Sequence, residues 1–267
     1  MEDREAVAHR YADQLTDRDL LALADGRVDQ VPALRREPSL VLDLLDRPSV
    51  TDMLLADRRD PTGRFRHVSP FLLFAAAVHR TAGGLVGRLH VPDRSRTRSA
   101  LPVFDGPVLA AFAADPRHRL FLAELLASYA TVASGVLWRR DDRGARKQRW
   151  DELDLPQLAA LLDAVPTERR PGVWRRIGDG ALFLAGVFPE FAQRTLSGPG
   201  LSRLERGTGV DVARVGPVQE LLEQLAERAY GQARSVPPGV AEEPRSAHRV
   251  LSLVAQRHLF PADLTPR

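Results

Sequence analysis

Apolar residues recur along this chain at steps of three and four, and this spacing restricts the fold to one built mainly from helices. The strongest example is the segment from Val173 to Phe188, whose apolar stripe is wide enough to bury most sides of a helix. A second segment, Pro70 to Thr81, is apolar almost all round and follows Ser69, a residue suited to cap a helix. We predict that these two helices form the centre of the core.

One stretch predicts β-strands. Residues 136–140 and 145–150 carry bulky side chains on either side of an Asp/Gly turn, which is typical of a hairpin. The sequence shows no internal repeat and no domain-sized linker, so we predict a mainly α fold, a single multi-helix globular domain over residues 1–267 with one small β-hairpin. A candidate N-terminal helical subdomain covers residues 1–90, and the hairpin is an insertion over 136–150. Three segments are expected to be irregular: residues 90–105, the glycine-rich 198–209 and the proline-rich 235–244.

Composition excludes several chemistries. The chain has no cysteine, so disulfides, thiolate catalysis and cysteine-ligated metals are ruled out. The charged N-terminus has no apolar signal region, and the longest apolar run, Pro70 to Val78, is far shorter than the roughly 20 residues of a membrane span. We therefore expect a bacterial cytosolic protein with no membrane association.

The basic residues are almost all arginine, because Lys147 is the only lysine among 38. Arginine binds phosphate through its planar fork, which favours a phosphate-binding protein. A GC-rich genome would give the same excess through its codons. The 35 acidic residues leave a formal net charge of only +3, so the codon explanation is favoured.

Asp179 is the one acid in the middle of the most apolar helix. A buried carboxylate is costly without partners, and Arg175 and Arg176 lie four and three residues earlier. An ion pair of structural importance is the favoured interpretation. The alternative is a ligand-facing carboxylate beside a flexible Gly178–Gly180 turn.

The same segment carries a resemblance. Gly178-Asp179, Ala181 to Leu184, Gly186 and Phe188-Pro189 resemble a "GD-aliphatic-aromatic-x-x-G-x-F" motif of uncharacterised bacterial proteins, and Ala229-Tyr230-Gly231 resembles the helix end that follows it there. The resemblance covers residues 173–231 only. The chain departs from the pattern after Gly209 to Val212, where the relatives have adjacent tyrosines. The resemblance implies a helical fold and supplies no activity or catalytic residue.

Short catalytic and ligand-binding motifs are missing from the sequence. It contains no HExxH, GxSxG, P-loop or GxGxxG pattern. His79 lies on the apolar helix, where a core histidine bonded to a carbonyl is favoured over a haem or metal ligand. We therefore predict no catalytic residue, no metal and no cofactor, although a spatial constellation of distant residues remains open.

The hairpin gives the sharpest functional signal, because it is rich in basic residues and bounded by Trp138 and Trp150. A basic β-ribbon can contact nucleic-acid phosphates as a wing. The favoured alternative is a solvated hairpin anchored by its tryptophans, since Asp141 and Asp142 at the tip oppose phosphate. The candidate nucleic-acid or anion-binding residues are Arg139, Arg140, Arg143, Arg146, Lys147 and Arg149.

Three hypotheses follow, in order of preference. The first is a non-catalytic binding or regulatory protein with a protein partner, whose partner surface is expected on the amphipathic helix over 215–233. The second is a nucleic-acid-binding protein that uses the arginine-rich hairpin. The third is an enzyme with a pocket in the helical body that contains Asp179 or His79.

Overall fold

The computed structural model describes residues 2–56, 68–93, 101–141, 144–196, 198–212 and 216–260. It divides the chain into two compact units, each described separately below. Unit 1 comprises Met1–Ala130 together with Leu253–Arg267, and unit 2 comprises Thr131–Ser252. A division by contacts does not test whether the chain is one domain, so the single domain and the subdomain over 1–90 stay predictions.

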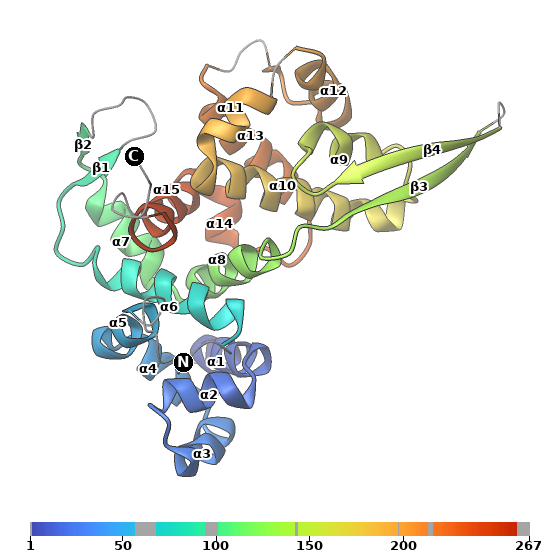
Figure 1. The fold of residues 1–267 in the computed structure, drawn as a ribbon. Helices are drawn as coiled ribbons and strands as arrows, with labels where there is room; N and C mark the ends of the chain where they lie inside the picture. The colour runs from blue at the N-terminus through green and yellow to red at the C-terminus, as the bar shows by residue number, and fades with distance from the viewer. Residues whose placement is uncertain are drawn as a thin grey trace. The chain divides into compact units, whose positions relative to one another are not determined.

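The fold is mainly α, which confirms the predicted class (Figure 1). The helices of unit 1 are α1 (Glu2–Gln14), α2 (Asp17–Leu23), α3 (Val31–Arg36), α4 (Ser39–Leu45), α5 (Pro48–Ala56), α6 (Pro70–Gly83), α7 (Gly106–Ala114) and α8 (Pro116–Ser128). Those of unit 2 are α9 (Leu155–Leu161), α10 (Arg170–Val187), α11 (Pro189–Thr195), α12 (Pro199–Thr208), α13 (Val218–Tyr230) and α14 (Pro238–Glu242). Helix α15 (Pro244–Val254) crosses the boundary and continues into a π-helical turn, Ala255–Leu259.

Capping residues set several of these helix starts. Thr16 caps α2, and Asp19 completes the capping box by accepting from the Thr16 amide at 2.9 Å. The other oxygen of Asp19 accepts from the amide of Ser69 at 2.6 Å, and Ser69 itself caps α6. Asp19 therefore joins the beginnings of two helices that lie 50 residues apart in the sequence.

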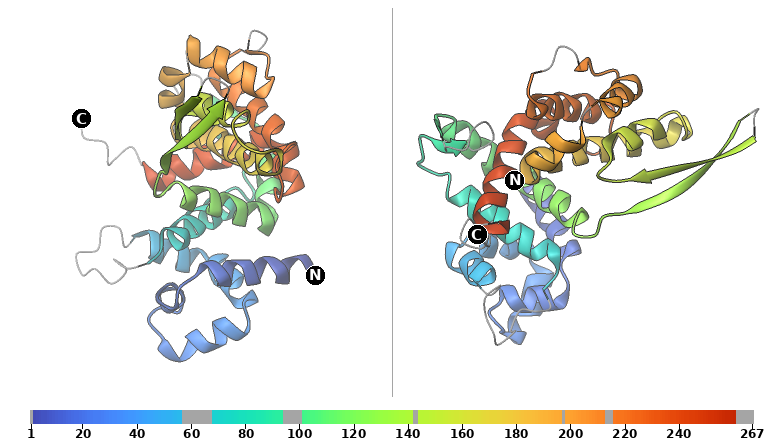
Figure 2. Two further views of the ribbon diagram at one scale, coloured as in Figure 1. Left: turned by 90° about the vertical axis from the view of Figure 1, so that its right-hand side faces the viewer. Right: turned by 45° about the horizontal axis from the view of Figure 1, so that its top comes forward.

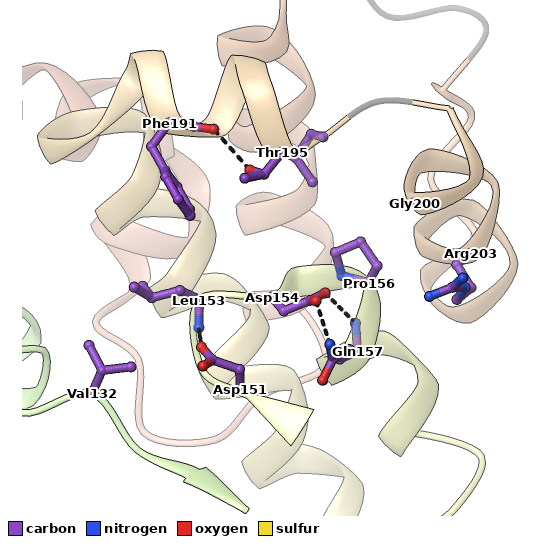
Figure 3. A pocket seen from close by; sticks show the side chains of 11 residues that line it. Val132, Asp151, Leu153, Asp154, Pro156, Gln157, Phe191, Thr195, Gly200 and Arg203 are labelled. Atoms are coloured by element: carbon purple, nitrogen blue, oxygen red, sulfur yellow. Dashed lines mark hydrogen bonds between the residues drawn. The ribbon is translucent and has the colours of Figure 1, made fainter. Parts of the chain in front are cut away.

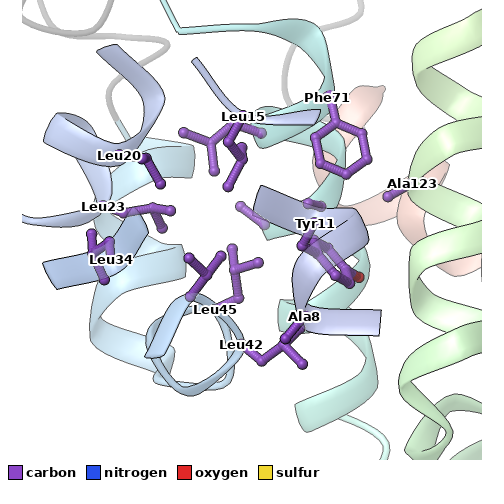
Figure 4. Packing of buried hydrophobic residues seen from close by; sticks show 14 of the residues in the cluster. Ala8, Tyr11, Leu15, Leu20, Leu23, Leu34, Leu42, Leu45, Phe71 and Ala123 are labelled. Carbon is purple, nitrogen blue, oxygen red and sulfur yellow. The ribbon is translucent and has the colours of Figure 1, made fainter. Parts of the chain in front are cut away.

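The core of unit 1 lies among α1, α2, α4, α6 and α8. Figure 4 shows Tyr11 of α1 and Leu15, the residue after this helix, facing the same interior as Leu42 and Leu45 of α4. Each of these side chains is buried, as predicted for the apolar face of an amphipathic helix. Helix α6 contributes Leu72, Ala75 and Ala76 to this core.

The core of unit 2 is centred on α10, which packs along α13. Every residue of α10 from Ile177 to Val187 is buried. Two glycines of α10 admit neighbouring helices. A Cβ on Gly178 would lie 2.5 Å from the Tyr230 ring, and one on Gly186 would lie 2.5 Å from Cβ of Leu251. Close helix packing thus explains why Gly178 and Gly186 have no side chain.

The predicted hairpin is present and longer than expected. Strands β3 (Ser134–Asp141) and β4 (Gly144–Asp151) pair antiparallel, with Ser134 opposite Asp151 and Val136 opposite Arg149. The right-hand view of Figure 2 shows this ribbon extending away from the helices of unit 2. At its base the Trp150 ring covers Gly135, whose missing Cβ would lie 2.9 Å from the indole nitrogen.

Three predicted irregular segments contain regular structure. Within 90–105, strands β1 (Val91–Asp93) and β2 (Leu101–Val103) form a short antiparallel ladder. Within 198–209, α12 forms because Gly207 allows it to approach α9, with a Cβ there only 2.9 Å from that of Ala159. The proline-rich stretch contains α14, with prolines before and at its first position.

Candidate functional site

Asp179 is buried in unit 2 and fully engaged. The Nε of Arg175 donates to both carboxylate oxygens, at 2.8 and 2.9 Å, and the Tyr230 hydroxyl donates to one of them at 3.0 Å. Burial raises the pKa of the Asp179 carboxyl, and the charge of Arg175 opposes that rise. Residues 178–180 are helical, so the flexible turn of the ligand-facing alternative is absent. These contacts join two helices, because Asp179 belongs to α10 and Tyr230 belongs to α13.

Arg176 is held by a second carboxylate. It donates to Oε1 of Glu152, whose other oxygen accepts from the amide of Ala133 at 3.0 Å. Glu152 is 6% exposed, so it forms a buried link between α10 and the residues that flank β3 and β4. Arg175 and Arg176 are thus committed to contacts inside unit 2.

His79 lies in a buried polar chain of unit 1. Its Nδ1 is 2.8 Å from Oδ1 of Asp46, and its Nε2 is 2.9 Å from the hydroxyl of Tyr11. Arg119 donates to the same oxygen of Asp46 at 2.7 Å. The expected partner of His79 was a carbonyl; the observed partners are a carboxylate and a phenol from other helices.

Burial sets the ionisation of this chain. It lowers the pKa of His79 to about 4, although Asp46 opposes the shift, so the imidazole is neutral near pH 7. Burial also raises the pKa of Tyr11. For Asp46, burial would raise the pKa, but the hydrogen bond from His79 and the positive charge of Arg119 outweigh burial and lower the pKa. A neutral imidazole then donates from Nδ1 to Asp46 and accepts from Tyr11.

The hairpin candidates can be placed only by backbone. The register puts Arg139 opposite Arg146 and Trp138 opposite Lys147. Alternation along the strands assigns positions 140, 147 and 149 to one face and positions 139 and 146 to the other. The side chains of these residues, and the whole of Arg143, lie outside the described part of the structure.

A pocket of unit 2 lies at the base of the hairpin, with a volume of about 530 Å³. Figure 3 shows Val132 and Arg203 at opposite ends of the pocket, with Phe191 of α11 and Leu153 nearer to Val132. Val132 is 43% and Phe191 38% exposed, which is high for large apolar side chains. The full lining is Val132, Asp151, Leu153, Asp154, Pro156, Gln157, Phe191, Thr195, Leu196, Gly200 and Arg203.

The polar lining of this pocket is partly used by the fold. Asp151 accepts from the amide of Leu153, and Asp154 accepts from the amide and side chain of Gln157 as the cap of α9. Arg203 is exposed, and its side chain forms no hydrogen bond or ion pair with any described residue. The pocket therefore combines an apolar wall with one available cation. Neither Asp179 nor His79 lines it, so it does not provide the arrangement that the enzyme hypothesis requires.

A partner surface predicted on the helix over 215–233 cannot use the apolar face of that helix. The apolar face of α13, including Leu221, Leu222 and Leu225, is buried. Its outward residues Gln224, Glu227 and Arg228 are polar and exposed. Exposed apolar side chains occur instead at the unit 2 pocket and, in unit 1, at Val86, Leu89, Phe104 and Val108.

The pocket residues were missed by the sequence analysis because four separate stretches of the chain supply them. Phe191 lies on α11, at the end of the predicted central segment, and Arg203 lies on α12, in a stretch expected to be irregular. The exposed apolar character of Val132 becomes visible only once the fold is known.

Across the described residues, no three His, Asp or Glu side chains gather as a metal site would require. No helix in the same part of the chain has the length and apolar character needed to cross a membrane. Comparison with protein-family models, curated proteins and solved structures found no match. Functional inference therefore depends on the geometry of the chain itself.

Proposed function

We propose that this chain is a non-catalytic binding protein, of the bacterial cytosol, that holds a segment of a protein partner in the unit 2 pocket. The observation that carries the proposal is the combination of exposed Val132 and Phe191 with the available guanidinium of Arg203 in one pocket. Apolar anchors that fill a concave site, with a polar contact to fix orientation, dominate the binding energy of protein interfaces. The matching ligand is an apolar side chain next to an acidic group.

Selection of a random peptide library against the purified protein tests this proposal. We expect enriched peptides to share an apolar anchor followed or preceded by Asp or Glu. Replacing Phe191 with Ala is expected to weaken their binding about tenfold or more, and Arg203→Glu to weaken it further through charge repulsion.

Phe188 provides the matched control, because it is also 38% exposed but does not line the pocket. Phe188→Ala is expected to leave peptide affinity unchanged, once thermal unfolding shows that both variants are folded. Enriched peptides that bind Phe191→Ala, Phe188→Ala and the wild-type chain with equal affinity would refute the pocket as the binding site.

The second candidate function is nucleic-acid binding by the hairpin. The observation in its favour is the extended two-stranded ribbon, which places five basic positions along eight-residue strands (Figure 1). Arginine on such a ribbon contacts phosphates without reading sequence.

A salt series with labelled duplex DNA and single-stranded RNA tests this candidate. The double change Arg140→Ala with Arg143→Ala is expected to weaken binding for all sequences and to reduce the salt slope. The control is Arg169→Ala with Arg170→Ala, an equal loss of charge at an exposed site outside the hairpin. Equal affinity of the hairpin variant and the wild-type chain would exclude the wing.

A further inference from the structure

Three arginines form a cluster in unit 1, whereas the pocket and the hairpin belong to unit 2. Arg257 belongs to the π-helical turn Ala255–Leu259 that follows α15. Such turns are rare, and they are found frequently at functional sites. The turn puts Arg257 beside the end of α6, which lies more than 170 residues earlier in the chain.

Gly84, the residue that ends α6, makes this approach possible. A Cβ on Gly84 would lie 3.3 Å from Nη1 of Arg257 and 3.4 Å from the carbonyl oxygens of Arg80 and Thr81. The Arg257 guanidinium is therefore packed against the last turn of α6. The partial negative charge at a helix C-terminus favours a cation there, which accounts for the position of Arg257.

The helix end does not account for the other two arginines. Arg80 is in the last turn of α6 and pairs with Asp52, with Nε 2.5 Å from Oδ1. Arg88 is exposed in the turn just beyond α6. The side chains of Arg88 and Arg257 form no hydrogen bond or ion pair with a described residue.

The charges of this cluster repel one another. Burial lowers the pKa of Arg257, and the nearby charges of Arg88 and Arg80 lower it further. Only Asp52, on Arg80, offsets the three positive charges among the contacts of the described residues. A half-buried guanidinium next to a second unpaired one is costly for the free protein, and an anion would remove that cost.

We propose that Arg257 and Arg88, with Arg80 beside them, form a binding site for an anion that carries a phosphate group. Each unpaired guanidinium group offers a planar fork of N–H donors that can bind two oxygens of a phosphate group. The exposure of Arg88 leaves the site open to solvent, so a ligand can reach it without opening the core. The phosphate group could belong to a free metabolite or to a lipid headgroup.

Calorimetric titration of the full chain with sodium pyrophosphate at low salt tests the site. We expect saturable binding of one equivalent. Arg88→Gln and Arg257→Gln are each expected to weaken it about tenfold or more, since each removes charge-assisted hydrogen bonds. Arg18→Gln is the control, because Arg18 is an exposed arginine of unit 1 on α2, outside the cluster.

A second arm uses vesicles of equimolar phosphatidylcholine and phosphatidylglycerol. Binding to vesicles but not to pyrophosphate, lost in Arg88→Gln, would identify the phosphate as a lipid headgroup. The double hairpin variant Arg140→Ala with Arg143→Ala is expected to bind both probes normally, which separates this site from the candidate wing. If Arg257→Gln does not fold, Arg88→Gln carries the test, because Arg88 is on the surface. The site is excluded if neither probe binds saturably, or if Arg18→Gln weakens binding as much as Arg88→Gln.

Discussion

At the residue scale, the buried imidazole of His79 links the stability of unit 1 to pH. Its folded-state pKa is about 4, against 6.5 for an unperturbed histidine. Between these values the unfolded chain binds a proton that the folded chain does not, so stability is full above pH 6.5 and falls as pH drops toward 4. The expected loss is about 3 kcal/mol. Urea unfolding at pH 7 and pH 4.5 measures it.

His79→Gln is the comparison for this prediction. Glutamine can bond both Asp46 and Tyr11, and it does not titrate. We expect the variant to be less stable than the wild-type chain at pH 7 and to lose less stability between pH 6.5 and 4.5. The same pH slope in both proteins would show that His79 is not the group responsible.

Gly178 shows how one missing methyl group determines packing. Gly178→Ala would put Cβ 2.5 Å from the Tyr230 ring, which cannot move without disturbing its bond to Asp179. We expect a loss of about 1–3 kcal/mol in the free energy of unfolding. Gly172→Ala, on the same helix, meets no atom within 4 Å and is expected to be neutral or slightly stabilising. Denaturant unfolding of both variants checks the difference, and equal effects would contradict it.

At the element scale, the base of the hairpin depends on Glu152. This carboxylate joins Arg176 of α10 to the amide of Ala133, next to β3. Glu152→Ala leaves Arg176 and that amide without their partner, and we expect a loss of about 1–3 kcal/mol in the free energy of unfolding. This loss is smaller than that expected for breaking a fully buried ion pair, because Arg176 is partly exposed. Hydrogen exchange of residues 134–151 is expected to accelerate more than that of α13.

The control for this element is Glu168→Ala, since Glu168 is an exposed glutamate near the start of α10. It is expected to change neither stability nor hydrogen exchange in the hairpin. Unchanged exchange in Glu152→Ala would show that strand pairing alone holds the ribbon in place.

Local signals in the sequence were sufficient for many elements. The cap at Ser69 predicted the start of α6, because the side chain and the amide that it binds are close in the chain. The ladder of β1 and β2 and the helix α12 were missed, because strand pairing and the contact of Gly207 with Ala159 depend on distant residues. The pocket could not be predicted for the same reason.

At the scale of the whole molecule, each unit has its own buried core, so we predict that a core change in one unit can be followed separately from the other. The three tryptophans, at positions 138, 150 and 174, all belong to unit 2, so their fluorescence reports the unfolding of that unit, while far-ultraviolet circular dichroism reports the helices of both units.

Leu42 is fully buried in unit 1, and Leu42→Ala is expected to lower the free energy of unfolding by about 2–5 kcal/mol. The dichroism transition should then begin at lower denaturant while the fluorescence transition stays in place. Leu222→Ala, equally buried in unit 2, should move the fluorescence transition instead. Coincident shifts of both signals in both variants would mean that the chain unfolds as one cooperative body, with helix α15 continuous across the boundary as the element that couples the units.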